Sequence, residues 1–113
     1  MISALEKHEW ALLRRLRLAA LDESPDAFSP TYAETVGYSD ARWRDSARRF
    51  AEHSGFVMLI ARPDLGLMSA TTDDDAVGHI GAMWVTPEAR GRKLGRALLD
   101  AGIDHLERRG CSL

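Results

Sequence analysis

Apolar residues in the first part of the chain recur at the spacing of a helix that buries one face. They predict a first helix that stops before Pro25, because proline disfavours helical backbone in the residue before it. Arg14, Arg15 and Arg17 lie between these apolar positions, and we interpret them as the solvated side of the helix. The apolar positions are Trp10, Leu13, Leu16, Ala20 and Leu21.

A second helical pattern follows after an interval. Ser39 or Asp40 is a suitable N-cap for this helix. Ser54 and Gly55 end the helical pattern. The interval itself, residues 27–38, is predicted to be an ordered excursion rather than a linker. The residues that share the apolar face are Trp43, Ala47 and Phe50.

The period then changes to that of strands. Residues 56–61 form a short apolar run, which predicts a buried strand, and residues 67–72 and 76–85 predict two more. Turn residues separate the first two, and three aspartates (73–75) mark a hairpin tip. Residues 94–109 then predict a helix, with a glycine at 110 as its C-terminal cap.

Composition limits the classes of protein. The chain has 113 residues, the size of one domain, and 45% hydrophobic with 28% charged residues is typical of a globular fold. A net charge of −2 argues against a general nucleic-acid binder, and the single cysteine, Cys111, excludes an internal disulfide. The first residues do not have the pattern of a signal peptide, and no apolar run approaches the roughly 20 residues of a membrane helix, so neither segment is expected. We therefore expect one domain over residues 1–113, cytoplasmic, without a nucleic-acid or membrane partner.

Candidate chemistry concentrates where the third strand passes into the last helix. The first turn of a helix has backbone N–H groups without partners, and glycine lets an anion approach them. Glycines at 91 and 95 with four cations nearby therefore suit a phosphate, although an ordinary loop with solvated arginines stays an alternative on spacing alone. The segment is neither a Walker A loop nor a dinucleotide-binding fingerprint. Because the aspartates and histidines lack ligand spacing, no metal is expected.

The same segment resembles motif A of the GNAT superfamily of N-acetyltransferases. Residues 16–21 and 24–28 also resemble the first helix and following loop of many bacterial members. The resemblance implies an α+β, three-layer fold with a mixed, mostly antiparallel sheet flanked by helices. The strand that usually opens this fold is not evident before the first helix. The motif reads Val85-x-Pro87-x-x-Arg90-Gly91-x-x-x-Gly95.

By this resemblance, the co-substrate is acetyl-coenzyme A and the acceptor is a small-molecule or peptide amine. The pyrophosphate is expected on the loop, and the pantetheine at the strand end. Lys93 stands where the family pattern has glycine; a positive φ there would cost about 1 kcal/mol, whereas its ammonium could add a phosphate contact. The implied binding residues are Val85, Arg90, Gly91, Arg92, Lys93, Leu94, Gly95 and Arg96.

The resemblance implies direct attack of the amine on the thioester, which requires a general base. The family often has a glutamate six residues before the motif's valine, where this chain has His79. Histidine titrates near neutral pH, and regular alternation predicts that His79, Gly81, Met83 and Val85 share one face of the strand. A backbone N–H near Val85 would polarise the thioester carbonyl. The alternative for His79 is a strand-rim histidine with no catalytic duty.

Family members continue beyond the position of Leu113 with a strand, a helix and a hairpin. We expect residues 111–113 to begin that strand and the chain to be the front portion of the fold. An exposed strand edge would then favour a homo-oligomer. The family's later helix usually supplies a tyrosine that protonates the departing thiolate. The alternatives are a non-catalytic acyl-coenzyme A-binding or interaction module and a truncated, inactive fragment.

Overall fold

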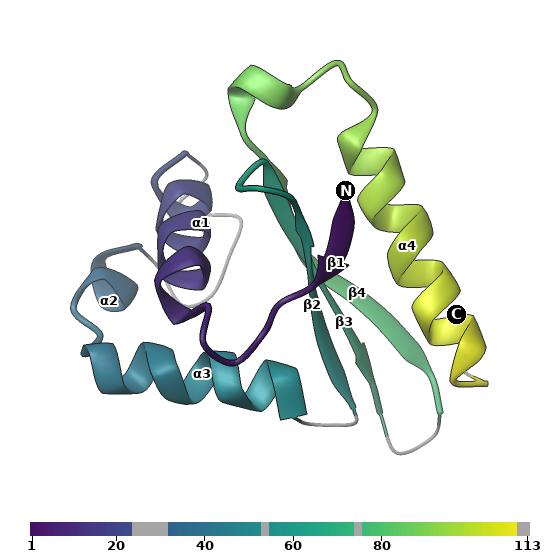
Figure 1. Cartoon of the computed structure of the whole chain (residues 1–113), viewed down its shortest axis with the longest axis horizontal. Helices are drawn as coiled ribbons and strands as arrows, with labels where there is room; N and C mark the ends of the chain where they lie inside the picture. Colours follow the sequence, from purple (N-terminus) through teal and green to yellow (C-terminus); the bar gives the residue numbers. More distant parts are fainter. Residues whose placement is uncertain (24–31, 53–54, 74–75, 111–113) are drawn as a thin grey trace.

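The computed structural model describes residues 1–23, 32–52, 55–73 and 76–110. The described strands form one antiparallel sheet in the order β1-β2-β3-β4. Helices α1 to α3 lie on one side of this sheet and α4 on the other (Figure 1). In chain order the elements are β1 (Ile2–Ala4), α1 (Trp10–Glu23), α2 (Tyr32–Val36), α3 (Asp40–Glu52), β2 (Phe56–Ala61), β3 (Gly66–Thr72), β4 (Gly78–Val85), a 3-10 turn (Pro87–Ala89) and α4 (Leu94–Arg108).

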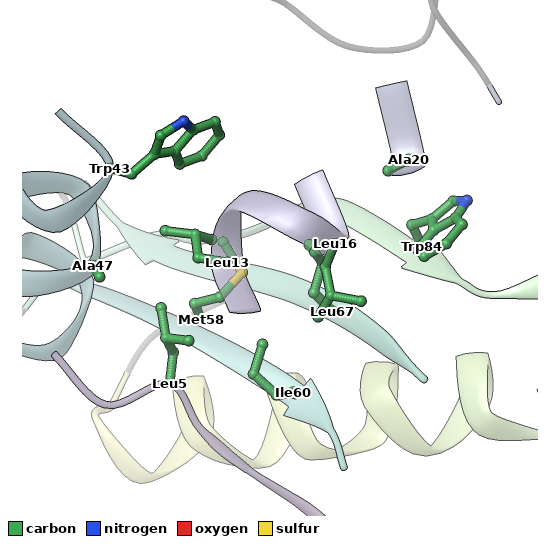
Figure 2. Close-up of a cluster of buried hydrophobic side chains, with 10 residues drawn as sticks. All are labelled: Leu5, Leu13, Leu16, Ala20, Trp43, Ala47, Met58, Ile60, Leu67 and Trp84. Carbon is green, nitrogen blue, oxygen red and sulfur yellow. The ribbon is translucent and has the colours of Figure 1, made fainter. Parts of the chain in front are cut away.

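The central strands β2 and β3 are buried on both faces, which explains their continuous apolar runs. Successive side chains of a strand point to opposite faces, so each strand contributes to two cores. Met58, Ile60 and Leu67 pack against α1 and α3 (Figure 2). Leu59 and Met68 instead pack against Leu98 and Leu106 of α4. The sheet is therefore the middle layer of three, and the predicted α+β fold is confirmed.

The helix ends follow the predicted capping residues. The Ser39 hydroxyl accepts a hydrogen bond from the Arg42 amide (3.2 Å), so Ser39 caps α3. Gly110, with φ of +76°, follows the last turn of α4. The interval before α3 contains the short helix α2, whereas the predictions for residues 24–31 and 111–113 lie outside the described residues. In the described part of the chain, no helix is both long enough and apolar enough to cross a membrane.

The structure adds a strand that the sequence does not predict. β1 pairs antiparallel with β2, in the register Ile2 opposite Ala61 and Ala4 opposite Leu59. Three residues are too few to establish an alternating pattern, which is why the sequence gives no sign of this strand. The opening strand that was not evident in the sequence is therefore present, and β1 occupies the edge of the sheet beside β2.

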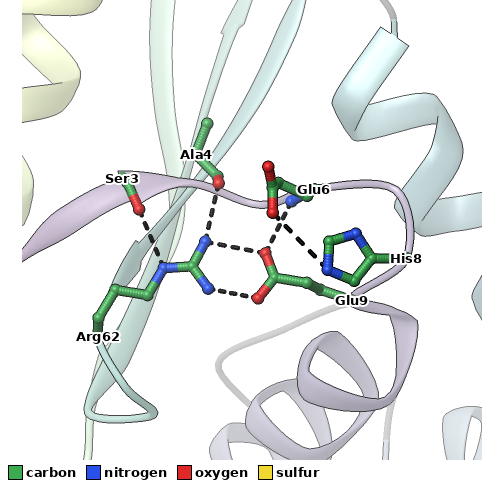
Figure 3. Close-up of polar contacts among 6 residues, drawn as sticks. All are labelled: Ser3, Ala4, Glu6, His8, Glu9 and Arg62. Atoms are coloured by element: carbon green, nitrogen blue, oxygen red, sulfur yellow. Dashed lines mark hydrogen bonds and ion pairs between the residues drawn. The ribbon is translucent and has the colours of Figure 1, made fainter.

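Arg62, directly after β2, holds β1 and the start of α1 in place (Figure 3). Its Nε donates to the Ser3 hydroxyl (3.0 Å), and its Nη2 donates to the Ala4 carbonyl (2.9 Å). The guanidinium also forms a two-point ion pair with the Glu9 carboxylate, in which the Glu9 side chain is only 15% exposed. Glu9 in turn accepts from the Glu6 amide (2.9 Å). One guanidinium therefore joins three segments of the chain.

The hydrogen bonds from Arg62 lower the pKa of Glu9 below its ordinary value. A carboxylate with a lowered folded-state pKa stabilises the fold above its unfolded-state pKa, and this contribution is lost as pH falls through the folded-state pKa. We expect Glu9→Gln to lower the free energy of unfolding by about 1–3 kcal/mol at pH 7. The difference from the parent should shrink as the pH is lowered below about 4.

Urea unfolding measured between pH 3 and pH 7 tests this prediction. Glu107→Gln, on the exposed surface of α4, is the matched control and should change the free energy by less than about 0.5 kcal/mol. A Glu9→Gln deficit that stays constant over the whole pH range would show that the carboxylate charge is not what stabilises this junction.

Candidate functional site

The loop between β4 and α4 takes left-handed backbone at two positions. Gly91 has φ of +88°, and Lys93, immediately before the first residue of α4, has φ of +61° and ψ of +22°. A left-handed residue followed by a right-handed helical one turns successive N–H groups toward one concave surface, a geometry that binds anions. Lys93 therefore has the positive φ that glycine adopts most easily. This is the strained backbone that the sequence leaves as one alternative for Lys93.

The N-terminus of α4 has backbone donors to offer. Its first backbone hydrogen bond runs from the Ala97 amide to the Lys93 carbonyl (3.0 Å), so the preceding amides of the turn have no partner within the helix. No side-chain cap is present at Lys93 among the described residues. Gly95 lies close to the strand end, since a Cβ there would be 4.0 Å from Val85 Cγ2. The helix dipole adds partial positive charge at this point.

The four predicted cations do not all converge on this turn. Arg90 donates to the Val85 carbonyl (3.2 Å) and forms an ion pair with Glu23 at the end of α1, so its guanidinium joins the loop to that helix. Arg96 pairs with Asp100 one turn along α4 (3.0 Å). Arg92 and Lys93 are exposed beside the turn. The backbone amides, Arg92 and Lys93 are therefore the donors best placed for an anion.

Thr86 is a residue that the sequence analysis missed. Its amide donates to the Leu65 carbonyl (2.8 Å), which fixes the loop where β4 ends. Its hydroxyl is buried and has no hydrogen-bond partner among the described residues. A buried unsatisfied hydroxyl is costly, and a ligand group at the strand end would satisfy it.

A β-bulge separates the two ends of β4. Leu67 pairs with Trp84, but Ser69 pairs with Gly81, so β4 has one more residue than β3 between these pairs. An extra residue reverses the alternation of side chains. Val85 consequently packs with the α4 core, while His79, opposite Thr71, is on the face of α1 and α3. The prediction that His79 and Val85 share one face is wrong for this reason.

His79 lies at the start of β4 beside the hairpin. Its Nε2 is 3.0 Å from the Asp73 Oδ2, and both side chains are about half exposed. The other carboxylate oxygen of Asp73 accepts from the Val77 amide (3.0 Å), which holds the carboxylate in position. An ionised carboxylate only accepts hydrogen bonds, so it favours the imidazole with its proton on Nε2 and a lone pair on Nδ1. The run of aspartates predicts only a solvated hairpin tip, so the contact of Asp73 with His79 is a feature that the structure adds.

A cavity of about 290 Å³ lies on the face of the sheet that carries His79. It is enclosed by α1, the region of α2, α3 and the central strands. Ser69 on its floor is the direct partner of Gly81, so His79 is its diagonal neighbour, about 7–8 Å away along the sheet. The lining residues are Leu13, Arg17, Thr35, Tyr38, Arg42, Trp43, Ser46, Phe50, Met58 and Ser69.

Arg17 does not lie on the solvated side of α1, where the sequence pattern predicts it. Arg14 and Arg15 are exposed, as expected for the solvated side of α1, but Arg17 is half-buried and lines the cavity. Burial lowers the pKa of its guanidinium from the ordinary value, because the charged form loses hydration. The signal was available: Arg17 follows Leu13 by four residues, which places both on the same helix face.

Comparisons with known proteins agree with this architecture. The family model described as "Acetyltransferase (GNAT) family" matches residues 13–113. A mycothiol acetyltransferase from Renibacterium salmoninarum is 28% identical over 101 residues, covering 83% of this chain. The chain spans only 28% of the length of that relative.

Solved structures share the fold. The PaiA N-acetyltransferase of Thermoplasma acidophilum in complex with coenzyme A superposes with a TM-score of 0.77 at 17% identity, over 98% of this chain and 74% of that one. An aminoglycoside acetyltransferase from an uncultured soil metagenomic sample gives a TM-score of 0.68 at 22% identity, with the same coverages. The resemblance read from the motif is confirmed, and the chain belongs to the acetyltransferase (GNAT) family.

Proposed function

We propose that this chain carries out acetyl-coenzyme A-dependent N-acetylation, moving the acetyl group to an amine by direct attack on the thioester. The observation that carries the proposal is the uncapped N-terminus of α4 behind the left-handed Lys93. Family membership supports it, as does the coenzyme A present in the complex of the Thermoplasma relative.

The residues of the loop fit the phosphates of such a co-substrate. The amides of residues 91–96 would donate to the pyrophosphate, with Arg92 and Lys93 as the nearest exposed cations. The pantetheine would pair with the end of β4 near Val85, where the Thr86 hydroxyl lacks a partner among the described residues. When bound, acetyl-coenzyme A supplies the acetyl group as a thioester.

His79 is proposed as the general base that takes a proton from the acceptor's ammonium group. Asp73 holds Nε2 at 3.0 Å, so Nδ1 is the nitrogen that accepts the proton directly or through water. The positive charge that develops on the ring is stabilised by the same carboxylate.

Two further interpretations stay predictions. β4 is the outermost strand on its side of the described sheet, so its free edge offers backbone groups to another strand, and we retain the expectation of a homo-oligomer through it. The cytoplasmic location is likewise retained as a prediction.

Calorimetry with acetyl-coenzyme A and with S-acetylpantetheine tests the proposed co-substrate. Because only the first carries phosphates, we expect it to bind at least about tenfold more tightly. Equal affinities, or no binding of either, would contradict the phosphate site at α4. Tight binding without acetylation of any amine would instead favour a non-catalytic acyl-coenzyme A-binding module.

Two variants at Lys93 separate backbone strain from charge. Lys93→Gly and Lys93→Ala both remove the ammonium, but only glycine relieves the left-handed backbone. We expect the glycine variant to unfold with a free energy about 1 kcal/mol higher than the alanine variant. If the ammonium binds phosphate, both variants should lose affinity for acetyl-coenzyme A equally. Equal stabilities in urea would show that the φ of this residue costs nothing.

His79→Gln should lower kcat by about a hundredfold or more, since an amide cannot accept the proton. The affinity for acetyl-coenzyme A should not change, because His79 lies at the opposite end of β4 from the loop. His8→Gln is the matched control: His8 is exposed and lies 3.7 Å from Glu6 at the N-terminus of the chain. An unchanged kcat in the His79 variant would assign that histidine to the strand rim without catalytic duty.

A further inference from the structure

Two guanidinium groups line the cavity between the helices and the sheet. Arg17 and Arg42 both line it, and none of its described lining residues is acidic. The Arg42 guanidinium lies 3.7 Å from the centroid of the Tyr38 ring, another lining residue, and stacks on it. Two guanidinium groups at one small cavity attract an oxyanion and disfavour a further cation.

The remaining lining supplies neutral donors and an apolar wall. Hydroxyl groups come from Thr35, which is 1% exposed, and from Ser46 and Ser69. The buried indole N–H of Trp43 has no acceptor among the described residues, so an acceptor oxygen on a ligand would satisfy it. The apolar side chains of the lining are Leu13, Phe50 and Met58.

We infer that the acceptor of the proposed acetylation is a small amphipathic amine that carries an oxyanion, bound through Arg17 and Arg42, with an apolar group against the cavity wall. The inference rests on the proposed function only in stating that the bound amine is acetylated. His79 is the diagonal neighbour of Ser69 across β3 and β4. An amine held by its oxyanion at Arg17 would therefore lie on the same face of the sheet as the proposed base.

The volume and charge restrict the acceptor class. At about 290 Å³ the cavity suits a molecule of amino-acid size rather than a folded protein surface. A polycationic amine would place its further ammonium groups against the two arginines. Relatives with this fold include an aminoglycoside acetyltransferase, but the cationic lining in this chain selects for the opposite charge.

Binding of matched ligand pairs, measured by calorimetry without co-substrate, tests the inference. Phenylalanine and phenylalaninamide differ only in the carboxylate, and O-phosphoethanolamine and ethanolamine differ only in the phosphate. We expect the anionic member of at least one pair to bind about ten- to a hundredfold more tightly. The pair that shows the difference identifies carboxylate or phosphate as the group recognised.

Arg17→Gln should reduce that preference to within about threefold, and Arg17→Lys should keep part of it because it keeps the charge. Arg14→Gln, on the exposed side of the same helix, is the control and should keep the full preference. Circular dichroism and urea unfolding verify that each variant is folded. If Arg17→Gln does not fold, the preference measured with Arg17→Lys tests the role of Arg17.

Ligands without the oxyanion that bind as tightly as their oxyanion-bearing partners, or tighter binding of spermidine than of any amine that carries an oxyanion, would overturn the inference. A preference that persists in folded Arg17→Gln would overturn the role of Arg17. Because these measurements need neither co-substrate nor turnover, they are decided independently of the proposed function. Selective binding without acetylation would count against the enzyme and leave the anion site standing.

Discussion

Burial of β2 and β3 on both faces is the constraint on which the rest of the structure depends. Their alternating side chains need apolar cover on two sides, which α1 and α3 provide on one and α4 on the other. Because these strands present few polar side chains, most polar groups lie at the strand ends, in the loops and on the helices, and Ser69 of β3 is an exception that faces the cavity. The left-handed turn at Lys93 lies in a loop, whereas the cavity lies between the helices and the central strands, on the other side of the sheet from α4.

The bulge in β4 places side chains from the two ends of this strand on opposite faces of the sheet. Without the extra residue, His79 and Val85 would lie on one face, and the His79 side chain would be directed toward α4. With it, the end of the strand packs with the layer that carries the phosphate turn, while its beginning belongs to the layer that carries the cavity. In the proposed reaction, the co-substrate would be held from one layer and the acceptor from the other, with β4 between them.

The sequence predicts most of this architecture because its periods are strong. The apolar run at 56–61 and the helical stripes of α1, α3 and α4 follow from burial that is repeated several times. β1 is too short to repeat, and the bulge depends on pairing with β3, which no local pattern encodes. The four-residue spacing from Leu13 places Arg17 on the buried face of α1. Its charge nevertheless predicts a side chain in solvent, so the sequence alone points to the wrong environment. The partners of Arg90 and His79 depend on side chains far away or across a hairpin, so only the folded structure reveals them.

The ion pair between Arg90 and Glu23 links the two layers at the top of the sheet. It is partly exposed and therefore adds little to the free energy of folding, yet it fixes the end of α1 to the loop that would hold the phosphates. Arg17 lies six residues earlier on the same helix, about 9 Å along its axis. The Arg90–Glu23 contact is therefore joined, through the last turns of α1, to the part of the cavity wall that Arg17 forms.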